Sequence, residues 1–381
     1  MLEKGASQVT IQMKRIIFIT QNLGRTGAEM LLWYSLLNLN KDKFKSHLFC
    51  SEKGALVDSL PSHIKHSIPY KKNRNRGVRF FRAILKILKI KPLEYQLKQL
   101  QKETNADFWY FNTIVNPEIY TIAAKLGVKI ITHFHELPMA YNFITYDNLK
   151  QIINYSTSFI GCSEAVCEKI NDMGGKDVRL LYGFIDQNKV SFRKSADEVK
   201  SNLGFSKQDF IWVVSGTTTL IKGIDFLIPL LNLLDENVKI LWIGGEEKRG
   251  TFFYVKSTLE SKFPGRVKFT GALADDYYNY LNCGDAFLSL SREDSFPLVM
   301  LEAATLGKPI VGFNSGGISE FVKEGTGIVV EQGNFNELVG AMTIVKNQPE
   351  KFSVDKIKNE AAKYRIEKQI SILEEILESI T

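Results

Sequence analysis

The sequence predicts an α/β protein made of two doubly wound units, each with a parallel sheet covered by helices. Three observations lead to this prediction. The chain has 381 residues, enough for two or three domains. Short apolar segments rich in β-branched residues alternate with segments of helical periodicity. The alternation restarts after about residue 191, behind a polar segment at 188–207 that we interpret as a linker. We therefore expect domains over residues 1–190 and 191–355.

Each unit can be followed element by element. The first opens with an apolar strand at 15–20, the loop Gly24-Arg-Thr-Gly27 and a helix at 28–39, an order typical of Rossmann-like units. Its other predicted strands are 46–50, 64–68, 108–111, 129–133, 158–162 and 178–181, with helices that include 116–126 and 163–173. The second has strands at 210–215, 239–243, 267–270, 286–290, 309–313 and 327–330, and helices at 223–234, 298–306, 334–345 and 356–380.

Composition and charge are those of a globular protein whose halves differ. Hydrophobic residues make up 44% and charged residues 24%, which argues against a disordered or fibrous chain. The net charge of +7 is unevenly spread. Residues 1–190 hold 27 basic and 16 acidic residues, net +11, whereas the rest of the chain is net −4. The two halves are therefore expected to have different partners.

Cysteines, histidines and apolar runs exclude several classes of protein. The cysteines form no C-x-x-C pair and are too few for a disulfide framework, so we expect buried thiols in a reducing compartment. No His or Cys cluster has zinc spacing. The apolar run at 16–19 is too short for a signal peptide, and nothing approaches the roughly 18–20 apolar residues of a membrane span. We expect a soluble, cytoplasmic protein. The four cysteines are Cys50, Cys162, Cys167 and Cys283.

A basic segment runs from Lys65 to Lys102, with twelve Lys and Arg residues and a single acid, Glu94. Within it, apolar residues recur at helical spacing between Phe80 and Ile90. Such a helix suits an anionic membrane surface, but it is equally typical of a surface helix whose apolar stripe faces the core. Nucleic acid is a weaker alternative, because no DNA- or RNA-binding motif accompanies the charge.

The most informative stretch follows the predicted strand at 286–290. Pro297 suits the first turn of a helix, so the free N–H groups of Leu298 and Val299 should face a ligand at the strand end. Asp294 lies before the helix and Glu302 within it. Two carboxylates around a phosphate-binding helix end would suit a ligand with hydroxyls and phosphates, such as a nucleotide-sugar. Equally, Asp294 could be a helix cap and Glu302 a solvated residue.

Two further turns follow the carboxyl ends of predicted strands, which is where open α/β sheets bind ligands. Lys222 precedes Gly223 in the turn after the strand at 210–215, and its charge could neutralise a leaving diphosphate. The turn does not match a Walker A motif. The loop Gly316-Gly317-Ile-Ser-Glu320 permits close backbone approach, although an ordinary turn accounts for it nearly as well.

Taken together, these motifs resemble the retaining glycosyltransferases of family 4 (glycosyltransferase group 1), which have the GT-B fold. The resemblance spans nearly the whole chain and is strongest over residues 216–330. Its motifs, in order, are Gly27-Ala-Glu29, His133-Phe-His-Glu136, Ser163-Glu-Ala-Val166, Lys222-Gly223, Trp242-Ile-Gly-Gly245, residues 267–271, the segment from Ser291 through Glu302, and Gly316-Gly317…Glu320.

The resemblance implies a central cleft between the two Rossmann-like domains and a C-terminal helix, about 360–381, that packs back on the first. It implies that Asp294 and Glu302 contact donor-sugar hydroxyls and the nucleotide ribose, Lys222 the diphosphate, and His135 the sugar near the reacting carbon. These four are the candidate catalytic residues. Candidate donor-binding residues are Gly24, Gly27, Thr217, Gly244, Gly271, Phe296, Leu298, Val299 and Glu302. In two departures from the family pattern, Thr217 replaces an arginine and Asp294 a glutamate.

The expected activity is transfer, with retained configuration, of a hexose-type sugar from a UDP- or GDP-sugar to a glycan or lipid-linked acceptor in cell-envelope or exopolysaccharide synthesis. No metal or other cofactor and no nucleic acid is expected. The protein would be cytoplasmic, at the inner face of the membrane if the basic segment binds lipid. The alternatives are a non-catalytic sugar-nucleotide-binding partner subunit and another GT-B enzyme, such as an epimerase or a phosphorylase.

Overall fold

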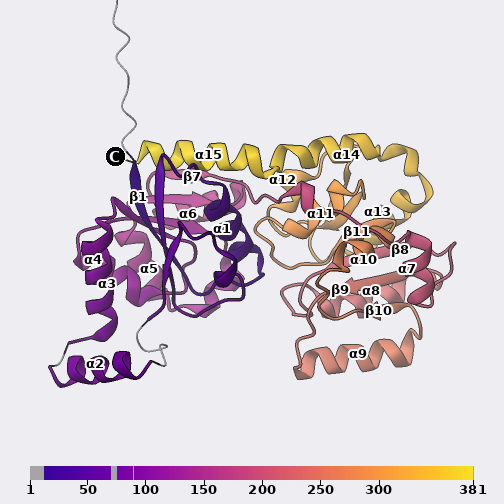
Figure 1. The fold of residues 1–381 in the computed structure, drawn as a ribbon. Helices are drawn as coiled ribbons and strands as arrows, with labels where there is room; N and C mark the ends of the chain where they lie inside the picture. The colour runs from indigo at the N-terminus through magenta and orange to yellow at the C-terminus, as the bar shows by residue number, and fades with distance from the viewer. Residues whose placement is uncertain (1–12, 70–74, 89, 381) are drawn as a thin grey trace, which may run out of the picture.

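The computed structural model describes residues 13–69, 75–88 and 90–380. They form two lobes, each built around a parallel sheet (Figure 1). The first sheet has seven strands in the order β3-β2-β1-β4-β5-β6-β7, and the second has six in the order β10-β9-β8-β11-β12-β13. Every strand pairing within these sheets is parallel. The predicted fold class, two Rossmann-like α/β units of GT-B type, is confirmed.

The first lobe contains the elements predicted for it, with ends that differ by a few residues. Its strands are β1 (Lys14–Thr20), β2 (Phe44–Cys50), β3 (Lys65–Ser67), β4 (Phe108–Phe111), β5 (Lys129–Phe134), β6 (Ser158–Gly161) and β7 (Val178–Leu180). Its helices are α1 (Gly27–Asn38), α2 (Arg76–Ile87), α3 (Pro92–Thr104), α4 (Pro117–Lys125), α5 (Tyr146–Tyr155) and α6 (Glu164–Asp172).

The second lobe repeats the pattern. Its strands are β8 (Ile211–Ser215), β9 (Lys239–Ile243), β10 (Val267–Phe269), β11 (Ala286–Ser289), β12 (Ile310–Phe313) and β13 (Gly327–Val330). Its helices are α7 (Ala196–Asn202), α8 (Leu227–Leu233), α9 (Gly250–Lys262), α10 (Tyr277–Cys283), α11 (Leu298–Thr305), α12 (Ile318–Phe321), α13 (Phe335–Asn347) and α14 (Val354–Ala361). The last helix, α15 (Ile366–Ser379), lies along the first lobe (Figure 1).

The strands are apolar because helices cover both faces of each sheet. In β1, for example, every residue from Ile16 to Ile19 is buried. One hydrophobic cluster is confined to the second lobe, and another joins the first sheet to α15 through residues such as Leu373 and Leu377. A third cluster contains side chains of both sheets. The lobes therefore share a continuous apolar contact below the candidate site.

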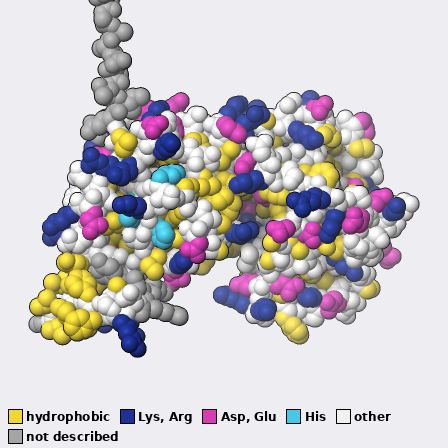
Figure 2. Space-filling view, viewed as in Figure 1, with side chains coloured by type: hydrophobic (Ala, Val, Ile, Leu, Met, Phe, Trp, Pro, Cys, Tyr) yellow, Lys and Arg dark blue, Asp and Glu magenta, His cyan; other side chains and the backbone are white. Residues whose placement is uncertain are grey.

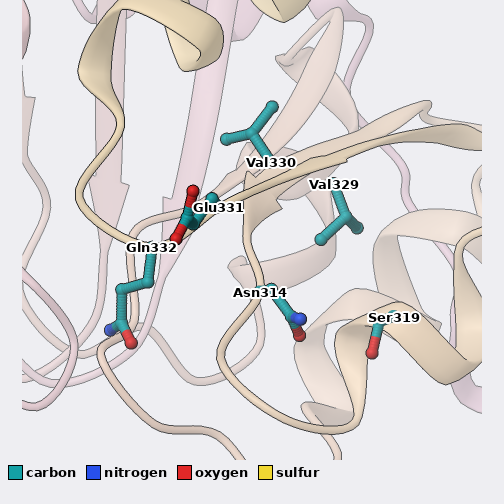
Figure 3. A pocket seen from close by; sticks show the side chains of 6 residues that line it. All are labelled: Asn314, Ser319, Val329, Val330, Glu331 and Gln332. Atoms are coloured by element: carbon teal, nitrogen blue, oxygen red, sulfur yellow. The ribbon is translucent and has the colours of Figure 1, made fainter.

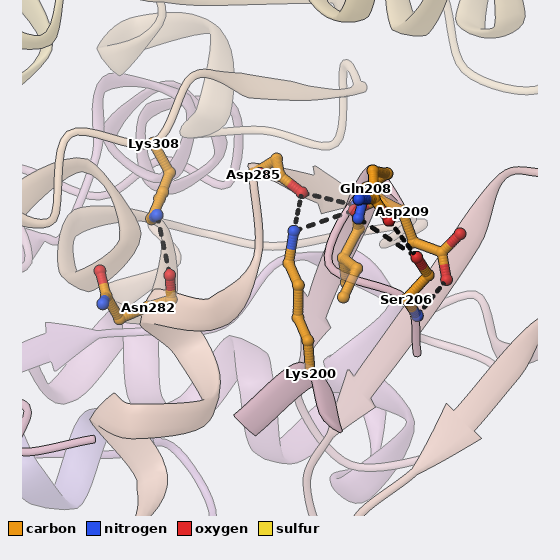
Figure 4. A network of polar contacts seen from close by, with 8 residues as sticks. Lys200, Ser206, Gln208, Asp209, Asn282, Asp285 and Lys308 are labelled. Atoms are coloured by element: carbon orange, nitrogen blue, oxygen red, sulfur yellow. Dashed lines mark hydrogen bonds and ion pairs between the residues drawn. The ribbon is translucent and has the colours of Figure 1, made fainter. Parts of the chain in front are cut away.

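The interpretation of residues 188–207 as a linker is wrong in part, because α7 lies within this segment. Ser195 caps α7 by accepting a hydrogen bond from the Glu198 N–H at 3.2 Å. Lys200 is buried, and its ammonium contacts the Asp285 carboxylate at 3.1 Å and the Asp209 carbonyl at 2.9 Å (Figure 4). Asp285 also accepts the Ile211 N–H at 2.8 Å, so this network fastens α7 to the start of β8.

Two predicted helices are shorter than expected. The helix expected at 223–234 begins as a 3₁₀ turn at Ile224–Phe226, because Gly223 has a φ of 74° that an α-helix cannot continue through. The helix expected at 356–380 is divided between α14 and α15 by a second 3₁₀ turn, Ala362–Tyr364.

Three of the four cysteines are buried, as expected for thiols packed in a protein core. All four are free, and the buried ones are Cys50, Cys162 and Cys283, whereas Cys167 is partly exposed. Among the described residues, no helix is long and apolar enough to cross a membrane.

The basic segment at 65–102 is divided among β3, α2 and α3. Leu85 is the one buried residue of α2. Four of the basic residues on which the charge prediction rests, Lys71, Lys72, Arg74 and Lys89, lie outside the described residues.

Candidate active site

The candidate site lies where the strand order of the second sheet reverses, between β8 and β11, at the carboxyl ends of the strands. The chain turns sharply there after β8 and β9. Gly216 has a φ of 149° and Gly244 a φ of 150°, and a Cβ on Gly244 would lie 2.0 Å from the Gly216 carbonyl oxygen. The Gly244 N–H also donates to the Gly271 carbonyl at 3.1 Å. These three glycines therefore allow close packing of the loops that form the floor of the site.

The amino end of α11 opens onto this floor. Pro297 precedes the helix, no side chain caps it, and no acid lies in its first turn. The N–H groups of Leu298 and Val299 at such an end are suited to an anion. The amino end of α1 lies against it, since a Cβ on Gly27 would be 3.9 Å from the Leu298 side chain. There the Glu29 carboxylate accepts the Thr26 N–H at 3.0 Å, so a carboxylate of α1 itself occupies the amino end of this helix.

Lys222 and Asp294 are brought together as an ion pair, although 72 residues separate them in the chain. The pair is largely shielded, with side-chain exposures of 28% and 12%. Ser291 Oγ donates to the same carboxylate at 3.3 Å. The backbone of Asp294 is held from both sides, by its N–H to the Ser315 carbonyl at 2.8 Å and by the Gly317 N–H to its own carbonyl at 3.1 Å.

Glu302 is held by two tyrosines of α10. Tyr277 donates to one carboxylate oxygen at 2.9 Å and Tyr278 donates to the other at 3.0 Å. The Ser215 hydroxyl lies 3.0 Å from the Tyr277 hydroxyl and forms a hydrogen bond with it. Burial raises the pKa of Glu302 from its ordinary 4.5 to about 7, and the two tyrosine hydrogen bonds limit the rise. Glu302 is therefore a group that titrates near neutral pH. Sequence reasoning missed both tyrosines, because no spacing relates them to Glu302.

His135 lies at the end of β5 in the first lobe and is neutral. Burial lowers its pKa to about 3. Its Nε2 lies 3.1 Å from Asn112 Oδ1, and the amide group of Asn112 donates to the Ala28 carbonyl at 2.9 Å. That donation assigns Oδ1 to the acceptor side, so Nε2 carries the imidazole proton and Nδ1 has a free lone pair. The ring lies against that of His133, tilted by 44° with centroids 3.9 Å apart. Asn112 was not singled out from the sequence.

Carboxylates of the second lobe fasten it to the first. The Glu320 carboxylate accepts the backbone N–H groups of Glu164 and Ala165, at 2.8 and 2.9 Å, at the amino end of α6. Glu293 accepts the Met139 N–H at 2.6 Å. Thus Glu293, which directly precedes Asp294, belongs to the contact between the lobes.

Ser295 adds a hydrogen bond that reaches the candidate site itself. Its hydroxyl donates to the His135 carbonyl at 2.7 Å. The backbone of His135 is therefore tied to the residue that follows Asp294, across the contact between the lobes.

Three further candidate donor-binding residues lie in loops of the two lobes. Thr217 is exposed on the loop after β8. Phe296 is buried between Tyr182 and Tyr364, with ring centroids 5.0 and 5.1 Å away, and so supports the contact between the lobes. Gly24 lies in the loop before α1, where a Cβ would meet Glu29 Oε2 at 2.7 Å.

A hollow of about 520 Å³ lies beside the site, at the ends of β12 and β13 (Figure 3). None of the candidate residues lines it. Among the described residues, no three His, Cys, Asp or Glu side chains are grouped so that they could hold a metal ion. The residues lining the hollow are Asn314, Ser319, Val329, Val330, Glu331 and Gln332.

Comparisons with known proteins relate the chain to glycosyltransferases. Residues 208–346 match the model of the family described as "Glycosyl transferases group 1". The chain is 26% identical over 254 residues to an N-acetyl-alpha-D-glucosaminyl L-malate synthase of Bacillus anthracis, spanning 64% of this chain and 66% of that protein. It is 26% identical over 230 residues to an alpha-galactosylglucosyldiacylglycerol synthase of Streptococcus pneumoniae, spanning 54% and 60%. The matches thus span less than two thirds of these relatives.

Solved structures show the same fold over nearly the whole chain. Anabaena HepE in complex with UDP and glucose superposes with a TM-score of 0.80 at 20% identity, covering 96% of this chain and all of that one. The lipopolysaccharide glycosyltransferase WaaG gives a TM-score of 0.70 at 13% identity, covering 95% and 99%. The described part of the chain therefore has the GT-B fold, and residues 208–346 match the sequence model of the glycosyltransferase group 1 family.

Proposed function

We propose that the chain is a retaining glycosyltransferase of family 4 that transfers a hexose-type sugar from a nucleotide-diphosphate sugar to a glycan or lipid-linked acceptor. The donor would bind the second domain, residues 191–355, and the acceptor the basic first domain, residues 1–190. The observation that carries the proposal is the Lys222–Asp294 ion pair beside the uncapped amino end of α11, with Glu302 inside the same helix and joined through Tyr277 to Ser215. The nucleotide-bound HepE structure and the glycosyltransferase relatives support it.

In this proposal the second domain binds the diphosphate, the sugar and the ribose of the donor. The diphosphate lies against the N–H groups of Leu298 and Val299, and Lys222 exchanges its contact with Asp294 for the phosphate. Asp294 then accepts hydrogen bonds from sugar hydroxyls, and Glu302 from the ribose. Negative charge grows on the diphosphate as the bond to the sugar breaks, and the ammonium and the helix end stabilise it.

The first domain contributes His135 and the acceptor. A neutral imidazole beside the reacting carbon can form a hydrogen bond without repelling the positive charge that develops on the sugar. The acceptor hydroxyl attacks from the face that the phosphate leaves, which retains the configuration. The lobes exclude water that would otherwise hydrolyse the donor. We propose that transfer needs no metal and that the enzyme works in the cytoplasm, at the inner face of the membrane, in envelope or exopolysaccharide synthesis.

A donor screen followed by one substitution tests the proposal. The sugar-nucleotide that raises the melting temperature in a screen of UDP-, GDP- and ADP-sugars is the candidate donor, since a ligand stabilises the state that binds it. Lys222→Ala should then lower the rate of sugar transfer by roughly 10²- to 10³-fold. Lys207→Ala, which removes an exposed lysine paired with Asp197, is the matched control.

Two results would contradict the proposal. Unchanged turnover in Lys222→Ala would remove the lysine from the mechanism, and donor binding without transfer or hydrolysis would favour a non-catalytic partner subunit. Transfer that stops with EDTA and returns with a divalent cation would contradict the metal-independent part alone.

A further inference from the structure

Helix α2 presents an apolar stripe to the outside of the molecule. Phe80, Ile84, Ile87 and Leu88 are 71%, 37%, 79% and 60% exposed. At about 100° per residue, positions i, i+4, i+7 and i+8 fall on one face of a helix. Figure 2 shows hydrophobic side chains gathered at this projecting end of the first lobe. Four large apolar side chains therefore form a continuous exposed surface.

One edge of the same apolar face, next to Leu88, accounts for the attachment of α2. Leu85 is buried, and the ring of Phe81 packs edge-on against Tyr95 of α3 with centroids 5.7 Å apart. The helix therefore docks through this edge of its apolar face, and the rest of the face stays outward. An ordinary surface helix does the reverse, burying its apolar stripe and exposing its polar face. Of the two interpretations that the sequence left open, the exposed stripe disfavours the core-packed helix.

Charge identifies the partner that fits this surface. Arg76, Arg79 and Lys86 follow one border of the stripe in the helical projection, and α2 contains no acidic residue. An apolar stripe bordered by basic side chains is the pattern of helices that lie in the interface of an anionic membrane. We propose that α2 docks the first lobe onto an anionic lipid bilayer, with the stripe in the acyl boundary and the basic border among the headgroups.

Two other partners fit less well. Nucleic acid would bind the basic border but would leave the aliphatic side chains of Ile84, Ile87 and Leu88 without an apolar contact. A second copy of the chain would bring two basic borders together, and one helix face of 12 residues is small beside the roughly 800 Å² per partner of a stable interface. This inference deepens the membrane location given in the proposed function, and it can be tested separately from sugar transfer, since docking requires neither donor nor acceptor.

Vesicle co-sedimentation of the full chain tests the proposal. The probes are phosphatidylcholine vesicles with and without phosphatidylglycerol, at low and high salt. One variant combines Phe80→Ser and Ile87→Ser, and another combines Arg79→Gln and Lys86→Gln. The matched control combines Val354→Ser on α14 with Lys368→Gln on α15, two exposed positions on the opposite side of the molecule from α2 (Figure 1).

Wild type should bind the anionic vesicles, and the apolar variant should lose more than roughly tenfold in partitioning. The charge variant should lose about fivefold per residue at low salt and much less at high salt. The control should match wild type, and unchanged melting temperatures would show that α2 is still folded.

Three results would overturn the proposal. The first is equal binding to both kinds of vesicle, and the second is an equal loss in the control. The third is that the wild type does not bind vesicles but forms a dimer or an RNA complex, and that the apolar variant does not form it. Loss of transfer activity with intact vesicle binding would count against the proposed function alone.

Discussion

Replacement of Glu302 by Gln should remove a pH dependence of stability that the wild-type chain carries. The carboxyl group ionises near its ordinary pH of 4.5 in the unfolded chain, but at about 7 in the folded chain. Between these values the folded chain holds the proton more tightly. The free energy of unfolding therefore falls as the pH rises. The contribution of this group is complete below about pH 4.5 and lost above about pH 7.

The size of the effect follows from the two pKa values. A rise from 4.5 to about 7 corresponds to about 3 kcal/mol, at roughly 1.4 kcal/mol per pH unit. This is an upper value, because the surroundings of the buried carboxylate can relax when it ionises. The unfolding free energy of the wild type relative to that of Glu302→Gln should therefore fall by up to about 3 kcal/mol from the acidic to the neutral end of this range.

Urea unfolding followed by the fluorescence of Trp212 and Trp242, both buried in the second lobe, measures this difference at each pH. Tyr277→Phe supplies a second check. It removes a hydrogen bond to the ionised carboxylate, so it should raise the pKa of Glu302 further and move the transition to higher pH. The reasoning fails if the wild-type and Glu302→Gln chains keep a constant difference in unfolding free energy across the range.

Three more substitutions test the packing and the contact between the lobes. Gly244→Ala should destabilise the second lobe by about 3 kcal/mol or more in urea unfolding, because its Cβ would overlap a backbone oxygen, whereas Gly245→Ala, with nothing within 4 Å, should not. Lys200→Met should cost about 2–3 kcal/mol by the same measurement, since it leaves the partly buried Asp285 without its cation; the exposed Lys207→Met should cost under about 1 kcal/mol. Glu320→Gln should weaken the contact between the lobes by about 1–2 kcal/mol, because an amide replaces the charge at the amino end of α6; an unchanged radius of gyration in solution scattering, together with unchanged stability, would contradict this.

The sequence determined the fold class and most of the elements by itself. A strand buried on both faces must be apolar, and the helix between two such strands must be amphipathic. Residues 15–20 and 286–290 were therefore predicted as strands from their apolar sequence alone. The position of α11 was equally local, because Pro297 marks its start. These features depend on residues close together in the chain.

Only the tertiary structure decided which side chains meet. The pairing of Lys222 with Asp294 and of Glu302 with Tyr277 arises because parallel strands bring their carboxyl ends to one edge of the sheet, whatever their separation in sequence. The ionisation of Glu302 likewise depends on burial by neighbours that no spacing reveals. For α2 the periodicity was plain from the sequence, but whether its apolar stripe faces the core or the outside depends on where the helix docks. Local pattern fixes the faces of a helix, whereas long-range packing decides which of them remains exposed.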